Sequence, residues 1–319
     1  MAETGTDIDR AKDLLDSGRL VAIPTETVYG LAGNAYNPSA ITEIFHVKNR
    51  PSFDPLIVHT DSIYRIDEFA EKIPGPLKKL AEAFWPGPLT LILRKKPVVP
   101  DIITSGLDTV AVRMPNHLLT LELLSRLDYP LAAPSANPFG YVSPTTASHV
   151  NEQLGKRIRY ILDGGPCTVG IESTIIGCED NIPIVFRLGG KSVEEIEEII
   201  GKVTIHSKEY AGIVAPGMLK SHYSPAKKVE MFDAISPGVI SSPTRSGALV
   251  FKIAHPGIPE ENQYILSDSG DLKEAGKNLF TGLRWLDSLD IDVIYAEMVP
   301  DHGIGRAVND RLKRAAAKK

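Results

Sequence analysis

The sequence predicts an α/β protein of two domains. Segments with the apolar spacing of strands and of helices alternate along most of the chain, which is typical of sheets covered by helices. Several connections between the expected strands are too short to hold a crossover helix, so the larger sheet should mix parallel and antiparallel strands. The length of 319 residues favours two domains over one.

The first domain is expected to span residues 1–206. It begins with a helix over residues 7–17, whose apolar residues share one face and which Gly18 closes in the left-handed conformation. Apolar runs then predict strands at about 20–24, 55–60, 88–94, 109–114, 129–133, 159–162, 172–178 and 183–188. Helical apolar spacing predicts helices at about 38–48, 62–70, 74–84, 117–127, 145–154 and 192–200.

Residues 207–228 are rich in glycine, proline and serine and have little periodicity, so we interpret them as an interdomain linker. The remaining chain, residues 229–319, is expected to form a small parallel α/β layer, with Asp301 capping its last helix. Its strands are expected at about 228–232, 247–253, 262–266 and 292–297, and its helices at about 271–288 and 303–317.

Charge argues against general binding of nucleic acid. The formal net charge is −5. It is the sum of −6 in residues 1–206 and +1 in residues 207–319. Binding to RNA phosphates requires clustered cations, and neither half has an excess of them. We interpret the local basic clusters, such as Lys156, Arg157 and Arg159, as solvated element ends.

Cysteine content and apolar runs limit the class of protein further. Cys167 and Cys178 are the chain's two cysteines, and neither they nor the eight histidines have metal-ligand spacing, so we expect no metal held by the protein alone. No apolar run approaches the roughly 20 residues that span a bilayer, and the charged first nineteen residues do not resemble a signal peptide. We therefore expect a cytoplasmic protein.

Polar residues follow the ends of several apolar strands. The run at 20–23 leads into PTETVYGL at 24–31, and the strand at 55–59 ends on His59. Ends of strands that turn polar are common places for sites. Lys48 and Arg50 stand two apart before Pro51, which should force an extended geometry in which both face one side. Two such cations suit a polyanion such as a nucleotide triphosphate.

The order of these motifs resembles that of the threonylcarbamoyl-AMP synthases, a YrdC-like family that makes the activated precursor of the threonylcarbamoyl group on an adenosine of some tRNAs. The motifs are PTETVYG at 24–30, KNR at 48–50, PLIVH at 55–59, SAN at 135–137 and IESTI at 171–175. The segments APGMLKSHYSP at 215–225 and GIGRAVNDRL at 303–312 resemble the two-domain members. The resemblance implies a YrdC-like twisted mixed sheet with covering helices and a smaller Rossmann-like C-terminal domain.

The reaction implied by this resemblance joins L-threonine, bicarbonate and ATP into threonylcarbamoyl-AMP and releases pyrophosphate. Such chemistry depends on positioning and charge neutralisation, so Lys48 and Arg50 are the expected catalytic residues. The resemblance also implies Mg²⁺ bound with ATP. The residues implied to contact ATP are Lys48, Arg50, Asp54, Thr109, Ser135, Asn137, Ser143, Arg187 and Tyr223.

The threonine-binding residues implied by the resemblance are Thr27, His59, Arg113, Ala133 and Ser173. Arg113 is the expected partner of the amino-acid carboxylate, because a bidentate pair fixes the plane of that group. Asp54 departs from the family, in which asparagine is common at this position, and a carboxylate facing phosphates needs a neutralising cation. Glu26 has no family role in this interpretation, and we expect it to make a structural hydrogen bond.

The linker carries His222 and Tyr223, which is unusual for a passive tether. We expect it to fold over the site, with the ring of Tyr223 against ATP, and to exclude water from the adenylate. Two alternatives remain open: a double-stranded RNA-binding module, and an enzyme that forms carbamoyl-AMP. The expected partners are the small substrates and the machinery that transfers the threonylcarbamoyl group to tRNA, while direct tRNA binding has no support from net charge.

Overall fold

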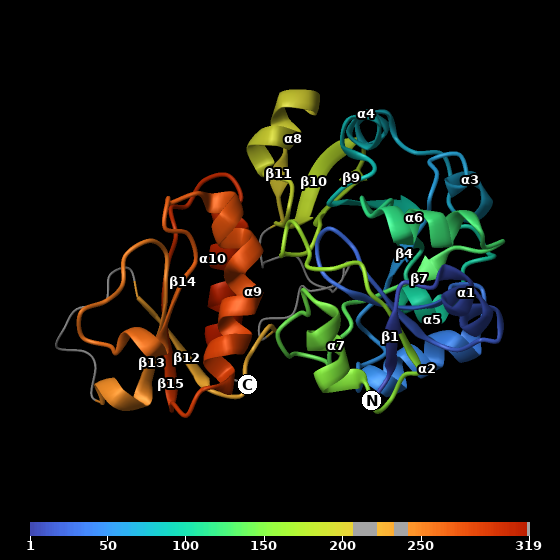
Figure 1. Cartoon of the computed structure of the whole chain (residues 1–319). Helices are drawn as coiled ribbons and strands as arrows, with labels where there is room; N and C mark the ends of the chain where they lie inside the picture. The colour runs from blue at the N-terminus through green and yellow to red at the C-terminus, as the bar shows by residue number, and fades with distance from the viewer. Residues whose placement is uncertain (207–221, 233–241, 318–319) are drawn as a thin grey trace. The chain divides into compact units, whose positions relative to one another are not determined.

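The computed structural model describes residues 1–206, 222–232 and 242–317, and these fall into two compact units (Figure 1). The first unit holds residues 1–139, 144–168 and 172–206. The second unit holds the described chain from residue 222 onward together with two short segments from the middle of the sequence, residues 140–143 and 169–171. Residues 207–221, which make up most of the expected linker, lie outside the described residues.

The first unit is built on an 11-stranded sheet in the order β1-β8-β2-β3-β7-β4-β6-β5-β9-β10-β11. Neighbouring strands are parallel in some pairs, such as β4 with β6, and antiparallel in others, such as β2 with β3, so the expected mixed sheet is confirmed. The strands are β1 (Glu3–Gly5), β2 (Val21–Ile23), β3 (Gly30–Asn34), β4 (Ile57–His59), β5 (Leu89–Arg94), β6 (Thr109–Arg113), β7 (Leu131–Ala132), β8 (Tyr160–Leu162), β9 (Thr174–Glu179), β10 (Ile182–Arg187) and β11 (Thr204–Ile205).

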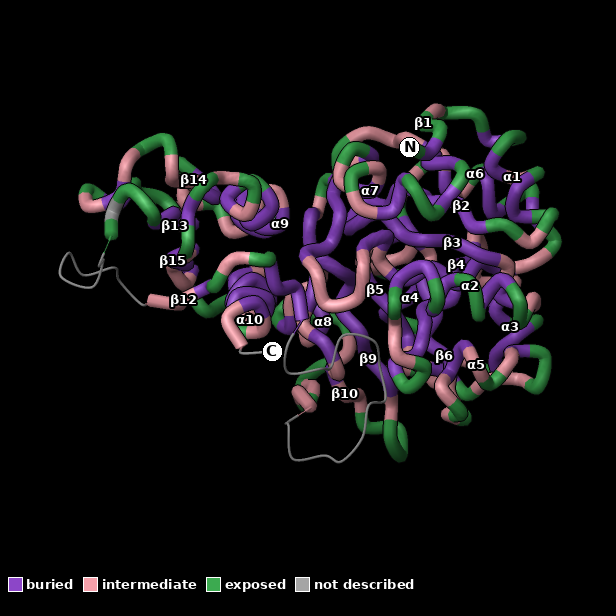
Figure 2. The backbone as a smooth tube through the Cα atoms, turned by 90° about the horizontal axis from the view of Figure 1, so that it is seen from below, coloured by how far each residue is buried: buried purple, intermediate pink, exposed green. Residues whose placement is uncertain are grey.

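Helices cover both faces of this sheet (Figure 1), and its central strands are buried, as their purple colour in Figure 2 shows. In β2, Val21 and Ile23 belong to one apolar cluster while Ala22 belongs to another, because side chains alternate between the faces of a strand. The helices of the first unit are α1 (Ile8–Asp16), α2 (Pro38–Lys48), α3 (Ile66–Phe69), α4 (Gly75–Phe84), α5 (Asp101–Thr104), α6 (Leu118–Ser125), α7 (Ala147–Leu154) and α8 (Val193–Ile200).

Helix α2 spans the predicted residues, but the chain leaves it differently from the expectation. Its first turn is capped by the side chain of Asn37, and Pro38 occupies the first helical turn, where its missing N–H has no cost. Lys48 is the last helical residue, and Asn49 follows in the left-handed conformation with φ of 51°. The prediction that Lys48 and Arg50 share one side of an extended segment is therefore wrong, because the backbone turns sharply between them.

The second unit contains a four-stranded parallel sheet, as the sequence predicts, and its strands stand in the order β12-β15-β13-β14. Figure 1 shows α9 and α10 together on one side of this sheet. The elements are β12 (Lys228–Phe232), β13 (Ser246–Val250), β14 (Gln263–Ile265), β15 (Val293–Glu297), α9 (Leu272–Ser288) and α10 (Gly305–Ala316), with short 3₁₀ turns η1 (Pro243–Arg245) and η2 (Glu260–Asn262).

Two local predictions differ from the structure. Asp301 does not cap α10, because its carboxylate instead accepts a hydrogen bond from the side-chain amide of Asn309, at 3.2 Å. The helix expected at 62–70 shrinks to α3, because the hydroxyls of Thr60 and Ser62 bond to nearby backbone N–H groups and favour turns. No helix among the described residues is both long and apolar enough to cross a membrane.

Candidate active site

Lys48 joins two of the motifs that lie far apart in the sequence. Its ammonium lies at the end of α2 and donates hydrogen bonds to the backbone carbonyls of Ser135 and Asn137, each at 2.5 Å. These carbonyls belong to the segment that follows β7, and the side chain of Lys48 is buried. Burial, and then the charge of Arg50, lower the pKa of Lys48 well below its usual range.

Arg50 is held by the loop that leads into β4. Its guanidinium forms an ion pair with the carboxylate of Asp54, at 2.9 Å, and donates to the backbone carbonyls of Asp54 and Pro55 at 3.0 and 2.8 Å. Both side chains are buried. The carboxylate of Asp54 at the expected phosphate site therefore has the neutralising cation that it needs, which is Arg50.

Arg113 ends β6 and has a partner at each of its three nitrogens. Nη1 donates to the hydroxyl of Thr27 at 2.7 Å, Nη2 lies 2.7 Å from a carboxylate oxygen of Glu26, and Nε donates to the backbone carbonyl of Gly87 at 3.4 Å. Thr27 and Glu26 come from the segment between β2 and β3. The structure therefore brings together the PTETVYG motif and the strand that ends on Arg113, and the hydrogen bond expected of Glu26 is a buried ion pair.

His59 stands beside Arg113 because β4 and β6 are parallel neighbours and these two residues are in register. Its ring is buried, and Nδ1 lies 3.3 Å from the carbonyl oxygen of Ile57. Burial, and then the positive charge of Arg113, lower the pKa of His59 to about 3. The ring is therefore neutral at physiological pH.

Ser173, which precedes β9, and Arg187, which ends β10, form a further cluster. The guanidinium of Arg187 donates to the carbonyl oxygen of Ser173 from two nitrogens, at 3.1 and 2.9 Å, and to its hydroxyl at 3.1 Å. That hydroxyl also shares a hydrogen bond of 2.7 Å with Thr90 on β5. Gly189 permits this packing, because a Cβ atom there would lie 2.4 Å from the backbone of Ser173.

Three further candidate residues differ in how they relate to these clusters. Thr109 begins β6 opposite Arg94, and in an extended strand it lies roughly 13 Å from Arg113. Ala133 follows β7 and donates its backbone N–H to the carbonyl of Ile57 on β4, the same carbonyl that lies against the ring of His59. Ser143 belongs to the second unit, where its carbonyl oxygen accepts a hydrogen bond from Arg284 at 3.2 Å.

Tyr223 is buried in the second unit. Its ring stacks on Phe280 with centroids 5.4 Å apart, and the guanidinium of Arg311 lies 5.5 Å from the centroid of the same ring. The contact of this ring with ATP therefore stays a prediction, and it requires the ring to leave this packing.

Sequence reasoning missed the groups that hold the expected site residues in place. Gly87 acts through a backbone carbonyl, Thr90 through a hydroxyl on an otherwise apolar strand, and Asn116 through its backbone N–H, which donates to Glu26 at 3.1 Å. None of these belongs to a recognisable motif. Cys167 is buried near Glu26, and burial raises the pKa of its thiol to about 12, so it stays protonated.

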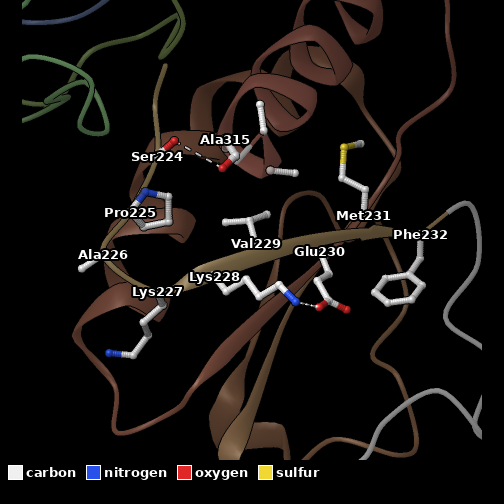
Figure 3. A pocket seen from close by; sticks show the side chains of 12 residues that line it. Ser224, Pro225, Ala226, Lys227, Lys228, Val229, Glu230, Met231, Phe232 and Ala315 are labelled. Atoms are coloured by element: carbon white, nitrogen blue, oxygen red, sulfur yellow. Dashed lines mark hydrogen bonds and ion pairs between the residues drawn. The ribbon is translucent and has the colours of Figure 1, made fainter. Parts of the chain in front are cut away.

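The second unit has a pocket of about 620 Å³ that contains none of the candidate residues. Figure 3 shows it between β12 and the end of α10, where the ion pair of Lys228 with Glu230 and the hydrogen bond from Ser224 to the carbonyl of Ala315 are drawn. Within the described part of the chain, no group of three or more His, Cys, Asp or Glu side chains is placed to bind a metal.

Comparison with known proteins places both units in one class. A family described as "Telomere recombination" matches residues 13–189, and a family described as "Threonylcarbamoyl-AMP synthase, C-terminal domain" matches residues 191–317. Relatives named threonylcarbamoyl-AMP synthase occur in Pyrococcus abyssi, at 42% identity over 96% of this chain and 93% of the relative, and in Bacillus subtilis, at 40% identity over 97% and 92%.

A crystal structure of Pyrococcus abyssi Sua5 complexed with L-threonine has the same fold, with a TM-score of 0.91 at 38% identity over 99% of this chain and 97% of that one. The mixed sheet and the smaller parallel sheet thus define a two-domain α/β protein with a YrdC-like first domain. The chain belongs to the threonylcarbamoyl-AMP synthase family, in its two-domain form.

Proposed function

We propose that this chain condenses L-threonine, bicarbonate and ATP into threonylcarbamoyl-AMP and releases pyrophosphate. The observation that carries the proposal is similarity along nearly the whole chain to relatives named for this product. The threonine complex of a full-length structural relative supports the choice of amino acid. The comparisons favour this function over both alternatives, the double-stranded RNA-binding module and the carbamoyl-AMP-forming enzyme.

The reaction needs two bonds to form. The neutral amine of threonine attacks bicarbonate, which gives a carbamate and water, and a carbamate oxygen then attacks the α-phosphorus of ATP and displaces pyrophosphate. We assign to Lys48 and Arg50 the neutralisation of the triphosphate, with Ser135 and Asn137 beside them, because Lys48 lies against the backbone of both. We assign Asp54, Thr109, Ser143, Arg187 and Tyr223 to the ATP side as well, with Tyr223 acting after it leaves Phe280.

We assign Thr27, His59, Arg113, Ala133 and Ser173 to threonine. The contact of Thr27 with Arg113 and the register of His59 with Arg113 support one compact pocket at the ends of β4 and β6. Buried polar groups around a small substrate give orientation and specificity. The contact of Ser173 with Arg187 supports an arrangement in which the threonine and ATP sides meet there.

Mg²⁺ would enter with ATP, because magnesium is commonly held by substrate phosphates and only one or two protein groups. The side-chain oxygens of Ser135 and Asn137 suit that role, whereas Asp54 is already paired with Arg50. Bound there, the ion would supply additional neutralisation of the phosphates. We also propose the domain boundaries 1–206, 207–228 and 229–319, a cytoplasmic location, and the tRNA threonylcarbamoyl-transfer machinery as the user of the product.

The test is incubation of the purified chain with ATP, bicarbonate and isotopically labelled threonine, followed by mass analysis for the labelled adenylate. Pyrophosphate release should require both threonine and bicarbonate, because their carbamate is the attacking group. Release at the full rate without threonine would remove this proposal and favour the carbamoyl-AMP alternative.

A further inference from the structure

Glu26 has one oxygen that is engaged and one that is not. Oε2 lies 2.7 Å from Nη2 of Arg113 and accepts a hydrogen bond from the backbone N–H of Asn116 at 3.1 Å. Oε1 is buried and has no hydrogen-bond partner among the described residues. A buried carboxylate oxygen without a donor is costly, so such an oxygen in a substrate pocket points to a donor that arrives with the substrate.

The guanidinium of Arg113 has N–H groups to spare next to this oxygen. It has five N–H groups, and its hydrogen bonds to Thr27 and Gly87 use one each, on Nη1 and Nε. Nη2 faces Oε2 of Glu26 as an ion pair and makes no hydrogen bond among the described residues, so it can donate to a further acceptor. The Glu26–Arg113 pair therefore offers both an acceptor and a donor. The hydroxyl and the neutral amine of threonine can each donate and accept at once, but the lone pair of the amine has to stay available for the attack on bicarbonate, which leaves the hydroxyl as the partner.

The charges around the pair favour a neutral group over a charged one. Arg113 and Glu26 neutralise each other, and the other titratable groups near them, His59, His117 and Cys167, are held in their neutral forms by burial, which lowers the pKa of both imidazoles and raises that of the thiol. A carboxylate or ammonium of the substrate would find no unpaired charge of opposite sign among these groups. Burying a charge without such a partner is expensive.

Chemistry also argues against the ammonium of threonine as the partner of Glu26. Only the neutral amine can attack bicarbonate, so a carboxylate bound to the ammonium would stabilise the unreactive form and slow the reaction. The hydroxyl takes no part in the bonds that form. It can remain bound through both steps.

We propose that Glu26 is a specificity-determining residue, which accepts a hydrogen bond from the side-chain hydroxyl of threonine through Oε1 while Arg113 donates to the same hydroxyl. This inference rests on the proposed function and deepens it. It also replaces the substrate carboxylate with the hydroxyl as the group that Arg113 reads. A site built in this way rejects an analogue without the hydroxyl strongly, because two buried polar groups are left unpaired.

The test compares kcat/KM for L-threonine with kcat/KM for L-2-aminobutyrate, which keeps the methyl group and lacks the hydroxyl. The wild-type chain should prefer threonine by about 100-fold or more. Glu26→Gln should reduce this preference to below about 10-fold, because the amide keeps the size of the side chain but no longer completes the pair. Glu26→Asp, which keeps the charge on a shorter side chain, should restore part of the preference.

Asp54→Asn is the matched control, because it also neutralises a buried carboxylate that is paired with an arginine. It should change the KM for ATP and leave the preference for threonine over 2-aminobutyrate at the wild-type value. A merely structural role of Glu26 would lower the activity with both amino acids equally. A wild-type preference in Glu26→Gln therefore overturns the inference.

The wild-type chain provides a second measurement that does not depend on the folding of any variant. L-serine keeps the hydroxyl and lacks the methyl group, so it should be a better substrate than L-2-aminobutyrate. The opposite order overturns the inference even while threonylcarbamoyl-AMP is formed. Formation of that adenylate from threonine by the wild-type chain tests the proposed function separately.

Discussion

Arg113 and Glu26 form a buried ion pair between the end of β6 and the segment that joins β2 to β3, with 2.7 Å between Nη2 and Oε2. Only 5% of each side chain is exposed, so water screens neither charge. Removing one member of such a pair leaves an unpaired buried charge, whereas removing both can be nearly neutral. The stability of the first unit and the proposed recognition of threonine therefore involve the same two residues.

Glu26→Gln should lower the free energy of unfolding by about 3–5 kcal/mol, and Arg113→Met by a similar amount. The double variant should lose less than the sum of the two, because it leaves no charge unpaired. Urea denaturation of the four proteins measures the coupling. Additive losses would show that the two side chains contribute independently to the free energy of unfolding.

Lys48→Ala and Arg50→Ala should each reduce kcat/KM, because each removes a cation assigned to the triphosphate. The expected loss of transition-state stabilisation is about 2–4 kcal/mol for each variant. Pyrophosphate release at saturating threonine and bicarbonate measures the effect. Lys78→Ala is a suitable control, since that lysine is an exposed cation on α4. Turnover at the wild-type rate in either site variant would reduce Lys48 and Arg50 to structural cations.

His59 should make the protein less stable in acid. Its pKa is about 3 in the folded chain, whereas an unfolded histidine titrates near 6.5. Below pH 6.5 the unfolded state binds a proton that the folded state does not, so stability is fully present above that pH and falls as the pH drops. The loss should be about 1.4 kcal/mol for each unit between about pH 6.5 and 3.

Comparison of wild type with His59→Gln in urea at pH 7 and pH 5 isolates this contribution, because the other histidines remain in both proteins. The wild-type chain should lose more stability over that interval than the variant. Equal losses would mean that the ring of His59 is protonated in the folded chain.

Gly189→Ala should weaken both stability and threonine binding. The new Cβ would lie 2.4 Å from the backbone of Ser173, so the backbone there has to shift. Ser173 would then move relative to Arg187 and Thr90, which bind its hydroxyl. Thermal unfolding and calorimetric titration with threonine measure the two effects, with Gly75→Ala as the control, because open space surrounds its Cβ position. Unchanged threonine affinity in Gly189→Ala would contradict the assignment of Ser173.

The sequence predicted most elements of the sheet because their apolar runs are long or strongly alternating. It missed β3, since Gly30 and Gly33 interrupt the apolar pattern, and it missed β1 and β11, which are only three and two residues long. Backbone pairing with neighbouring strands forms these three, and that information lies outside the local sequence.

In the candidate site, too, local sequence identified the residues but not their partners. Family motifs indicated Lys48, Arg50 and Arg113, but not that backbone carbonyls would hold all three or that an acid would pair with each arginine. Periodicity placed Lys48 and Arg50 on one side of an extended segment, whereas the left-handed Asn49 separates them. The pairing of Arg113 with Glu26 joins residues 87 positions apart, so it depends on the order of the strands rather than on spacing along the chain.

Removal of residues 207–319 tests the role assigned to the second domain. Residues 1–206 should fold, because the 11-stranded sheet and its two large apolar clusters lie within them. Residues 140–143 and 169–171 would lose their packing, since both segments belong to the second unit. We therefore expect slower synthesis or faster hydrolysis of the adenylate. The measurement is the yield of intact threonylcarbamoyl-AMP over time.

Tyr223→Ala in the full-length chain separates the ring's contribution from that of the rest of the second unit. If the ring leaves Phe280 to cover ATP, the variant should bind ATP more weakly and protect the adenylate less, while its threonine affinity stays unchanged. Phe280→Leu keeps Tyr223 but removes the ring it stacks on, so it should favour the released state and leave the protection of the adenylate intact. If Tyr223→Ala and the truncated chain both yield intact adenylate at the full-length rate, the linker only connects the two domains.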